Sequence, residues 1–572
     1  MQRPSLSFHR HRPFGGPSLC GDFFWRCLLA LLLSCCAAGC ASLPSNGERT
    51  PSQAFNAPEH TALGRLVQER KAQDRARSDS GFLLLDGVGT AFTSRLALIE
   101  GAQRSLDLQY YAIHADASTE ILLQGLRDAA RRGIRIRVLL DDFNIVGKDA
   151  QVLRLAFEPN VEIRLFNPLP GSRSSLIGRL VTSMKDMSRV QKRMHNKLFI
   201  ADSAVGITGG RNLGDAYFGT DEKSNFVDLD VLAAGAIVRT MSASFDRYWN
   251  DELAFPVEKL VTAQELEALR KPATSPEADP SISATKVSGT ATALPVATPT
   301  KTVLPDVTPT ASVSAEPKAM DLRKVPLVWA PALLLADKPG KIGPGDDEVD
   351  AGDTVVDGLL QLMQGARQDV LIISPYFVPG TQMMQLFADL RAKGTRIRVL
   401  TNSLASNDAP AAHAGYARYR RDLLALGVEL YEMRAAQEGT VGGMGSTAGL
   451  GSGDAAGGSK SGTSRASLHS KAVILDGRLA IIGSMNLDLR SQLKNSEVAL
   501  LIRSRTLSEQ ATRQIEAMMS QGAYRLELEQ GKLTWRAPAG APFKDARSEP
   551  DASARLKWLV RLLGPFAPDE ML

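Results

Sequence analysis

Cysteine is absent from the chain after residue 40. The 572 residues contain five cysteines, all near the amino terminus: Cys20, Cys27, Cys35, Cys36 and Cys40. A disulfide framework or a structural zinc site would need cysteines in the folded body, so neither is expected there. Histidine is also scarce, with seven residues in the chain, so a histidine that recurs at a fixed spacing is informative.

A strong excess of charge of one sign is missing too. The formal net charge is +5, and the segment before residue 40 holds four arginines and one aspartate, so 5 − 3 leaves about +2 for the remainder. Proteins that bind nucleic acid usually carry a concentrated basic surface. We therefore expect no nucleic-acid partner. The length exceeds what one hydrophobic core supports and predicts two domains or a duplicated domain.

The amino-terminal segment has the pattern of a targeting signal. Arginines precede an apolar run over residues 27–38, and Ala37-Ala38-Gly39 leads into Cys40. This resembles a bacterial lipoprotein signal, with cleavage before Cys40 and acylation of its thiol; an uncleaved membrane anchor is the alternative. Either way the body is expected in the cell envelope, anchored to a membrane and facing the periplasm. Ala41-Ser42, by resemblance to Gram-negative lipoproteins, favour the outer membrane over the inner.

Composition divides the chain into five parts. A polar stretch with three prolines follows the signal and leads into a helix near 61–76. Two segments lack any hydrophobic period, one rich in Pro, Thr, Ser and Ala and one in Gly and Ser. The predicted parts are a signal peptide (1–39), a tether (40–80), a first domain (81–270), a disordered insertion (271–320) and a second domain (321–572) with a flexible loop at 438–464.

A strand–helix–strand unit occurs twice. Strands are predicted at 105–113 and 134–140 around a helix at 119–132, and again at 369–377 and 395–400 around a helix at 382–393. Arg-Gly-Ile-Arg-Ile-Arg-Val-Leu (132–139) and Lys-Gly-Thr-Arg-Ile-Arg-Val-Leu (393–400) are nearly identical. Such units are typical of βαβ crossovers, so each half is expected to hold a mixed, largely parallel sheet covered by helices.

One polar motif also occurs twice. The first copy is His195-Asn196-Lys197, Asp202 and Gly209-Gly210-Arg211-Asn212; the second is His469-Ser470-Lys471, Asp476 and Gly483-Ser484-Met485-Asn486. The distance from His to Lys is 2 residues, from His to Asp 7 and from His to Asn 17 in both copies. Two copies in register favour a functional site over a solvated strand face.

The residue types of this motif suit phosphoryl transfer. One imidazole can attack phosphorus while the other, protonated, gives a proton to the leaving oxygen. Lysine and asparagine donate to the non-bridging oxygens, whose charge grows in the transition state. His195, Lys197 and Phe199 are expected to alternate along one strand, and the glycines before each asparagine to allow close approach to phosphate. A lysine beside each histidine argues against a metal site, so no metal or cofactor is expected.

These motifs are similar to the paired His-x-Lys-x4-Asp-x6-Gly-Gly/Ser-x-Asn motifs of the phospholipase D superfamily. The resemblance covers about residues 80–572 and is greatest to bacterial, periplasm-exposed cardiolipin synthases, through segments such as 375–380 and 484–491. It implies two duplicated α/β domains whose mixed sheets pack face to face about a pseudo-twofold axis. The fold class expected is therefore α/β, in a chain active as a monomer.

The resemblance also implies roles for single residues. His195 would be the nucleophile and His469 the general acid and then base, although the near-symmetric pair does not show which one attacks. Lys197, Asn212, Lys471 and Asn486 would hold the phosphate. The motif aspartates, Asp202 and Asp476, are grouped with the catalytic set, although in the family they mainly support the fold. An acid from the opposite half would orient each histidine, and the candidates are Asp228 and Glu497.

The expected reaction is metal-independent phosphatidyl transfer through a phosphohistidine. Cardiolipin would form from phosphatidylglycerol and a second phospholipid. Water as the acceptor would make the protein a phospholipase D, and a nuclease of the same superfamily is a further alternative. A non-catalytic lipid-binding lipoprotein is the alternative from another class.

Two further features are open at this stage. His413 is expected either to line a substrate groove or to lie on a solvated helix face. The segment 554–563 has apolar residues at helical spacing with Arg555, Lys557 and Arg561 between them. We favour a packed terminal helix over a helix on a membrane surface.

Overall fold

The computed structural model describes most of the body of the chain. It describes residues 43–47, 49–171, 179, 183, 186–221, 224–261, 265, 317–342, 354–435, 465–564 and 569. The predicted signal peptide, Cys40, most of the insertion at 271–320 and the whole loop at 438–464 lie outside these residues.

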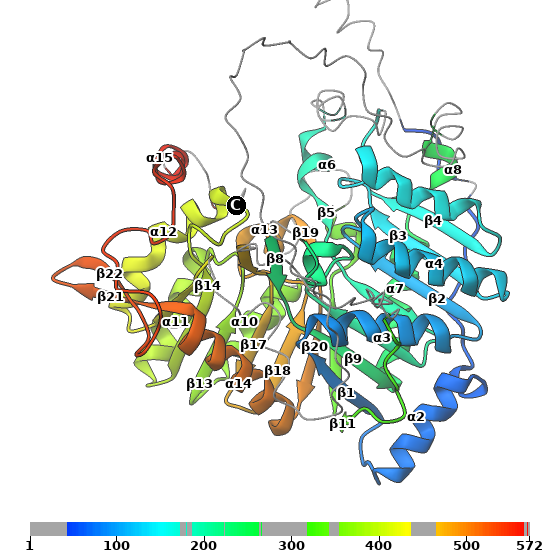
Figure 1. The fold of residues 1–572 in the computed structure, drawn as a ribbon, viewed down its shortest axis with the longest axis horizontal. Helices are drawn as coiled ribbons and strands as arrows, with labels where there is room; N and C mark the ends of the chain where they lie inside the picture. The colour runs from blue at the N-terminus through cyan, green and yellow to red at the C-terminus, as the bar shows by residue number, and fades with distance from the viewer. Residues whose placement is uncertain are drawn as a thin grey trace, which may run out of the picture.

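The first half is built on a nine-stranded mixed sheet (Figure 1). Only its β2–β3 and β3–β4 pairs are parallel; the remaining pairs are antiparallel. In spatial order the strands are β10 (Ala254–Pro256), β4 (Val161–Phe166), β3 (Arg135–Asp141), β2 (Ser105–Tyr110), β6 (Leu198–Ala201), β7 (Val205–Gly209), β9 (Asp230–Gly235), β1 (Ser80–Leu85) and β11 (Val328–Trp329).

The second half forms another nine-stranded sheet, in which eight strands repeat the order from β10 to β1; β22 has no counterpart in the first sheet, and β11 has none in the second. Its parallel pairs are again confined to three strands, β13–β14–β15. In spatial order the strands are β22 (Lys532–Arg536), β21 (Ala523–Glu529), β15 (Glu429–Met433), β14 (Arg396–Asn402), β13 (Asp369–Ile373), β17 (Ala472–Leu475), β18 (Leu479–Gly483), β20 (Val498–Arg503) and β12 (Ala332–Ala336), and β21 occupies the position of β10.

Two details differ from the sequence expectation. The sheets are mixed, but they are not largely parallel, because the hairpins β6–β7 and β17–β18, which carry the repeated motifs, add antiparallel strands beside the βαβ unit. In addition, β11 pairs with β1 although it follows the predicted domain boundary at residue 321. The second half of the chain therefore completes the sheet of the first.

The repeated helices begin and end at local signals. Helix α4 (Ala117–Arg131) starts where Asp116 accepts a hydrogen bond from the backbone N–H of Thr119. It stops before Gly133, whose positive φ of 86° an L side chain would oppose. Gly394 has a φ of 84° after α11 (Gly380–Ala392) in the second copy. Both repeated helices therefore end before a glycine with positive φ.

Three hydrophobic cores organise the body. The outer faces of the two sheets pack separately, one under α3 (Val88–Gly101) and α4, the other under α10 (Val355–Gln364), α11 and α12 (Pro410–Ala425). The central core is shared: strands of both sheets contribute to it with α7 (Ala236–Trp249) and α14 (Arg505–Gly522). Its members from the two halves include Phe82, Phe245, Trp249, Ile482, Leu500 and Ile515. The halves thus share one apolar interior.

Two short parallel ribbons also join the halves. β5 (Arg193–Met194) pairs with β19 (Asn495–Ser496), and β8 (Ser224–Val227) pairs with β16 (Arg465–Leu468). The remaining elements are η1 (Pro58–His60), α2 (Ala62–Gln73), η2 (Gly147–Phe157), α6 (Met187–Gln191), η3 (Asp215–Tyr217), α8 (Val257–Leu260), η4 (Pro339–Ile342), α13 (Leu489–Leu493) and α15 (Ala554–Leu563). No helix within the described ranges is both long and apolar enough to span a membrane.

The predicted tether is bound to the body over much of its length. Asn46 donates to the carbonyls of Glu252 and Ala254, at 2.7 and 3.0 Å. Further along, the Arg137 guanidinium donates to the Ser52 carbonyl at 3.1 Å. The tether thus supplies donors to carbonyls of the body, and its Ser52 carbonyl supplies an acceptor for the buried Arg137 guanidinium.

Candidate active site

Each His-x-Lys segment lies where the two halves meet. His195 follows β5, and its backbone N–H donates to the Ser496 carbonyl at 2.9 Å. His469 follows β16 and donates to the Val227 carbonyl at 2.8 Å. The strand expected to begin at His195 begins instead at Leu198, the first residue of β6. The backbone N–H of His195 bonds to the opposite half and not to a neighbouring strand of the sheet.

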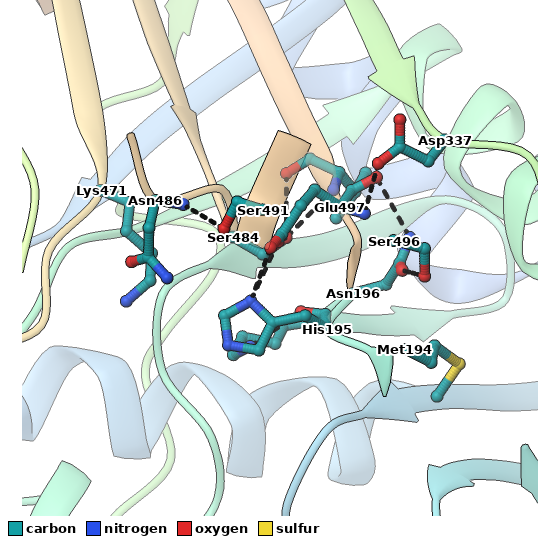
Figure 2. A network of polar contacts seen from close by, with 12 residues as sticks. Met194, His195, Asn196, Asp337, Lys471, Ser484, Asn486, Ser491, Ser496 and Glu497 are labelled. Atoms are coloured by element: carbon teal, nitrogen blue, oxygen red, sulfur yellow. Dashed lines mark hydrogen bonds and ion pairs between the residues drawn. The ribbon is translucent and has the colours of Figure 1, made fainter. Parts of the chain in front are cut away.

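Each imidazole faces a carboxylate of the other half. His195 Nδ1 lies 2.9 Å from Glu497 Oε2, and His469 Nδ1 lies 2.6 Å from Asp228 Oδ2. All four side chains are nearly inaccessible to solvent. Figure 2 shows the His195 ring directed at Glu497. Because Nδ1 is occupied in each ring, Nε2 is the nitrogen left to meet a substrate.

Burial sets the protonation of the histidines. It lowers the pKa of His195 to about 4, and Glu497 offsets this effect only in part. The pKa of His469 is lowered well below its usual value, first by burial and then by the two motif lysines. The pKa of Glu497 is lowered despite its burial, because His195 and Lys197 favour the carboxylate. The free site therefore holds a neutral His195 beside an ionised Glu497.

Both motif lysines are buried in the same site. Burial lowers the pKa of Lys197 to about 7 and that of Lys471 to about 8. Each lysine lowers the pKa of both histidines, which shows that the four groups lie within electrostatic reach of one another. The two lysines repel each other in this buried site, and a phosphodiester anion would relieve that repulsion.

The motif asparagines differ between the halves. The Asn212 amide donates to the Tyr217 hydroxyl at 2.9 Å, and its oxygen accepts from the Ala112 N–H at 3.3 Å. The Asn486 side-chain oxygen has no hydrogen-bond partner among the described residues. Its side chain lies next to Lys471 in Figure 2. Asn486 is thus the more available of the two to a phosphate oxygen.

The motif aspartates do not join the site. The Asp202 carboxylate accepts from the backbone N–H groups of residues 103, 104 and 105, at 2.7–2.9 Å. Asp476 accepts in the same way from residues 367, 368 and 369. Each stands beyond the end of its strand opposite the histidine and has a positive φ, 53° and 52°, so both aspartates that were grouped with the catalytic residues bind the backbone of their own half.

The glycine and serine before the asparagines have roles that the sequence did not suggest. A Cβ at Gly210 would collide with the Asp228 carboxylate, so this glycine makes room for the histidine-orienting acid and not for phosphate. At the matching position Ser484 donates to Glu497 Oε2 at 2.5 Å. Ser484 therefore fits beside the Glu497 carboxylate, whereas the Asp228 carboxylate leaves no space for a side chain at position 210.

Aromatic rings that sequence reasoning missed flank both histidines. Tyr111 meets His195 edge to face with ring centroids 5.2 Å apart. Tyr217 and Phe226 lie 5.4 and 5.0 Å from His469. The one available signal was the position of Phe226, two residues before Asp228 in the sequence. These rings exclude water from the imidazoles and restrict their rotation.

His413 takes neither of its expected positions. It is fully buried in α12 and its Nε2 lies 2.5 Å from the Arg420 guanidinium, beside Glu549. It therefore belongs to an internal polar cluster. Within the described ranges no group of three or more His, Cys, Asp or Glu side chains is arranged to hold a metal ion.

Paired His-x-Lys segments, joined across two duplicated mixed sheets, define a phospholipase D-like protein. The family model described as "Cardiolipin synthase, PLD-like domain" matches residues 96–249 and 359–519. "Cardiolipin synthase C" of Escherichia coli (strain K12) is 35% identical over 485 residues, which cover 84% of this chain and 94% of that protein. The chain therefore belongs to the phospholipase D-like cardiolipin synthase family, a family of phospholipid-modifying enzymes.

More distant proteins are similar over much of their length. "Cardiolipin synthase" of Geobacillus kaustophilus (strain HTA426) is 22% identical over 77% of this chain and 66% of its own. The crystal structure of phosphatidylserine synthase from Haemophilus influenzae Rd KW20 has a TM-score of 0.52 and 14% identity, covering 88% of this chain and 100% of that one. The latter likeness shows that the fold is shared.

Proposed function

We propose that the chain transfers a phosphatidyl group through a phosphohistidine. Nε2 of His195 would attack phosphorus while His469, protonated, gives its proton to the departing alcohol. An acceptor hydroxyl would then attack the phosphohistidine, with His469 taking the proton of that hydroxyl and His195 leaving. The observation that carries the proposal is the pair of histidine–acid contacts made across the two halves.

Binding of the substrate would favour the protonated form of His469, which is the proton donor. His469 is neutral in the free site because burial and two lysines oppose its charge. A bound phosphodiester adds a negative charge beside it, which favours the imidazolium. Lys197, Lys471 and Asn486 would then donate to the non-bridging oxygens as negative charge grows on them.

Cardiolipin is the product we propose, from phosphatidylglycerol as acceptor and a second phospholipid as donor. The names of the relatives support this choice. The same residues would serve water as acceptor, which gives a phospholipase D. Expression in cells without other cardiolipin synthases tests it: cardiolipin should appear with the wild type and with His60→Ala, a control at an exposed histidine, and should be missing with His195→Ala.

A covalent intermediate separates an enzyme from a lipid-binding lipoprotein. Labelled phospholipid mixed with the protein and quenched in acid-free denaturant should leave a lipid adduct on the wild type. We expect no adduct with His195→Ala or His469→Ala. Equal labelling of all three proteins would refute the mechanism.

We further propose that Cys40 is acylated and anchors a monomer to the periplasmic side of the cell envelope, at the outer membrane. The support is the sequence pattern around the cysteine. Metabolic labelling with an alkyne fatty acid should mark the wild type and not Cys40→Ser. Labelling of neither, with the protein still in the membrane fraction, would favour an uncleaved anchor.

A further inference from the structure

Helix α15 has apolar side chains on two opposite sides. Leu556, Leu559 and Val560 are half-buried where the helix packs on α12. On the other side Trp558 is 64% exposed and Leu562 is 49% exposed. A helix that only packs against its own protein is expected to present polar residues outward. Helix α15 therefore packs against the body, as expected, and also exposes a second apolar side to solvent.

Arginines border the exposed apolar strip on both edges. At about 100° per residue, the outward side chains follow one another around the helix as Arg561, Ala554, Trp558, Leu562 and Arg555. Both arginines are exposed, and in the part of the chain that the structure describes neither takes part in an ion pair. An apolar strip between cations is complementary to a surface that is apolar inside and anionic at its edge.

The helix lies on the same side of the molecule as the site. Figure 1 shows α15, α6 and α8 toward the upper edge, with the site ribbons β5, β19 and β8 below α6 and nearer the middle of the molecule. The described chain also starts near this edge, because Asn46 bonds beside β10, which adjoins α8. Cys40 is six residues before Asn46, a reach of about 20 Å at most.

We propose that α15 is a second membrane contact, an interfacial helix that places Trp558 and Leu562 in an anionic phospholipid bilayer. Together with the amino-terminal anchor it holds the site against the surface that contains the substrate. This inference rests on the proposed function insofar as that substrate is a bilayer phospholipid. Tryptophan favours the headgroup level, and each nearby arginine adds attraction to an anionic leaflet.

Brominated lipid tests the contact without any assay of activity. The full chain is reconstituted in vesicles of phosphatidylcholine and phosphatidylglycerol, with or without bromine on the acyl chains. The difference between wild-type and Trp558→Phe emission isolates the signal of Trp558. We expect this difference signal to be quenched in brominated vesicles and to stay unquenched in unbrominated ones.

A matched pair of variants tests the consequence. Trp558→Gln with Leu562→Gln should lower transfer on vesicles about tenfold or more, because two apolar side chains lose their burial. Transfer with detergent-dispersed substrate should not change. Leu333→Gln, at a 68% exposed position on β12, should change neither rate. Arg555→Gln with Arg561→Gln should weaken the vesicle rate most at low salt.

Three outcomes would overturn the proposal. One is a Trp558 signal that brominated lipid does not quench. Another is full vesicle activity in the Trp558→Gln, Leu562→Gln variant. The third is wild-type self-association that this variant abolishes, which would assign the strip to a second copy of the chain. If the wild type transfers no lipid in either assay, the proposed function fails while the quenching result still decides the membrane contact.

Discussion

The Glu497 carboxylate decides which nitrogen of His195 is free. It occupies Nδ1 and is itself held by the Ser484 hydroxyl, while the Glu497 N–H donates to Asp337 at 2.8 Å. Such a chain of bonds fixes both the tautomer and the direction of the ring. The same reasoning applies to Asp228 and His469 in the other half.

Glu497→Gln should therefore lower kcat by about 10²–10⁴-fold, since an amide does not hold the same tautomer or stabilise the imidazolium. KM should change little, because Glu497 does not face the phosphate. Glu429→Gln removes an exposed ion pair to Arg396 and serves as the control with full activity. Steady-state kinetics on dispersed substrate measures both, and a loss confined to KM would contradict the orienting role.

On the proposed mechanism the bound phosphodiester protonates His469, so the charges of the two lysines should set the alkaline limit of kcat/KM. His195 must be neutral, so activity rises with pH through its pKa of about 4. Activity then falls as Lys197, with a pKa of about 7, loses its charge. Lys197→Arg should move the alkaline limb up to that of Lys471, about 8, because arginine keeps its proton.

The matched variant for this pH profile is Lys471→Arg. It leaves Lys197 as the first lysine to lose its proton, so the alkaline limb should stay near 7. The readout is the position of the limb and not the height of the profile. Equal limbs in the two variants would show that neither lysine controls the pH dependence.

At the scale of elements, Asp202 fastens a loop to a strand. Its carboxylate binds three consecutive N–H groups between α3 and β2, and it has a positive φ, which Asn and Asp tolerate better than most residues. Asp476 repeats the arrangement between α10 and β13. The aspartates thus join the βαβ unit to the motif hairpin in each half.

Asp202→Ala should lower the free energy of unfolding by about 2–5 kcal/mol, because it leaves buried donors without an acceptor. Asp202→Asn should cost less, since one oxygen and the tolerance for positive φ remain. The kcat of folded protein should match the wild type in both. Urea denaturation and kinetics on the same samples check this, and a stable but inactive Asp202→Asn would instead support a catalytic role.

At the scale of the whole molecule, neither half contains a complete site. The orienting acid of each histidine comes from the other half, and the halves share the central core and two ribbons. Even the first sheet depends on β11 from beyond the insertion. The two halves are therefore joined by a shared core and by the site itself.

Cutting the chain within 271–316 should leave the two halves associated and active. A protease site placed there would be cleaved without exposing the central core, whose apolar contacts hold the halves together. Both fragments should elute together in gel filtration with unchanged kcat. Separation of the fragments after cleavage would show that the covalent link is needed.

The sequence alone determined the reacting groups and the duplication of the fold. His, Lys and Asn recur at spacings fixed by a hairpin, and the helices stop at glycines with positive φ; both depend on neighbours close in the chain. Only the tertiary structure decided the partners of those groups. His195 and Glu497 are 302 residues apart, and they meet because two sheets pack through a shared core. The sheet order, the role of Asp202 and the exposed strip of α15 likewise depend on packing between distant segments, which local spacing does not encode.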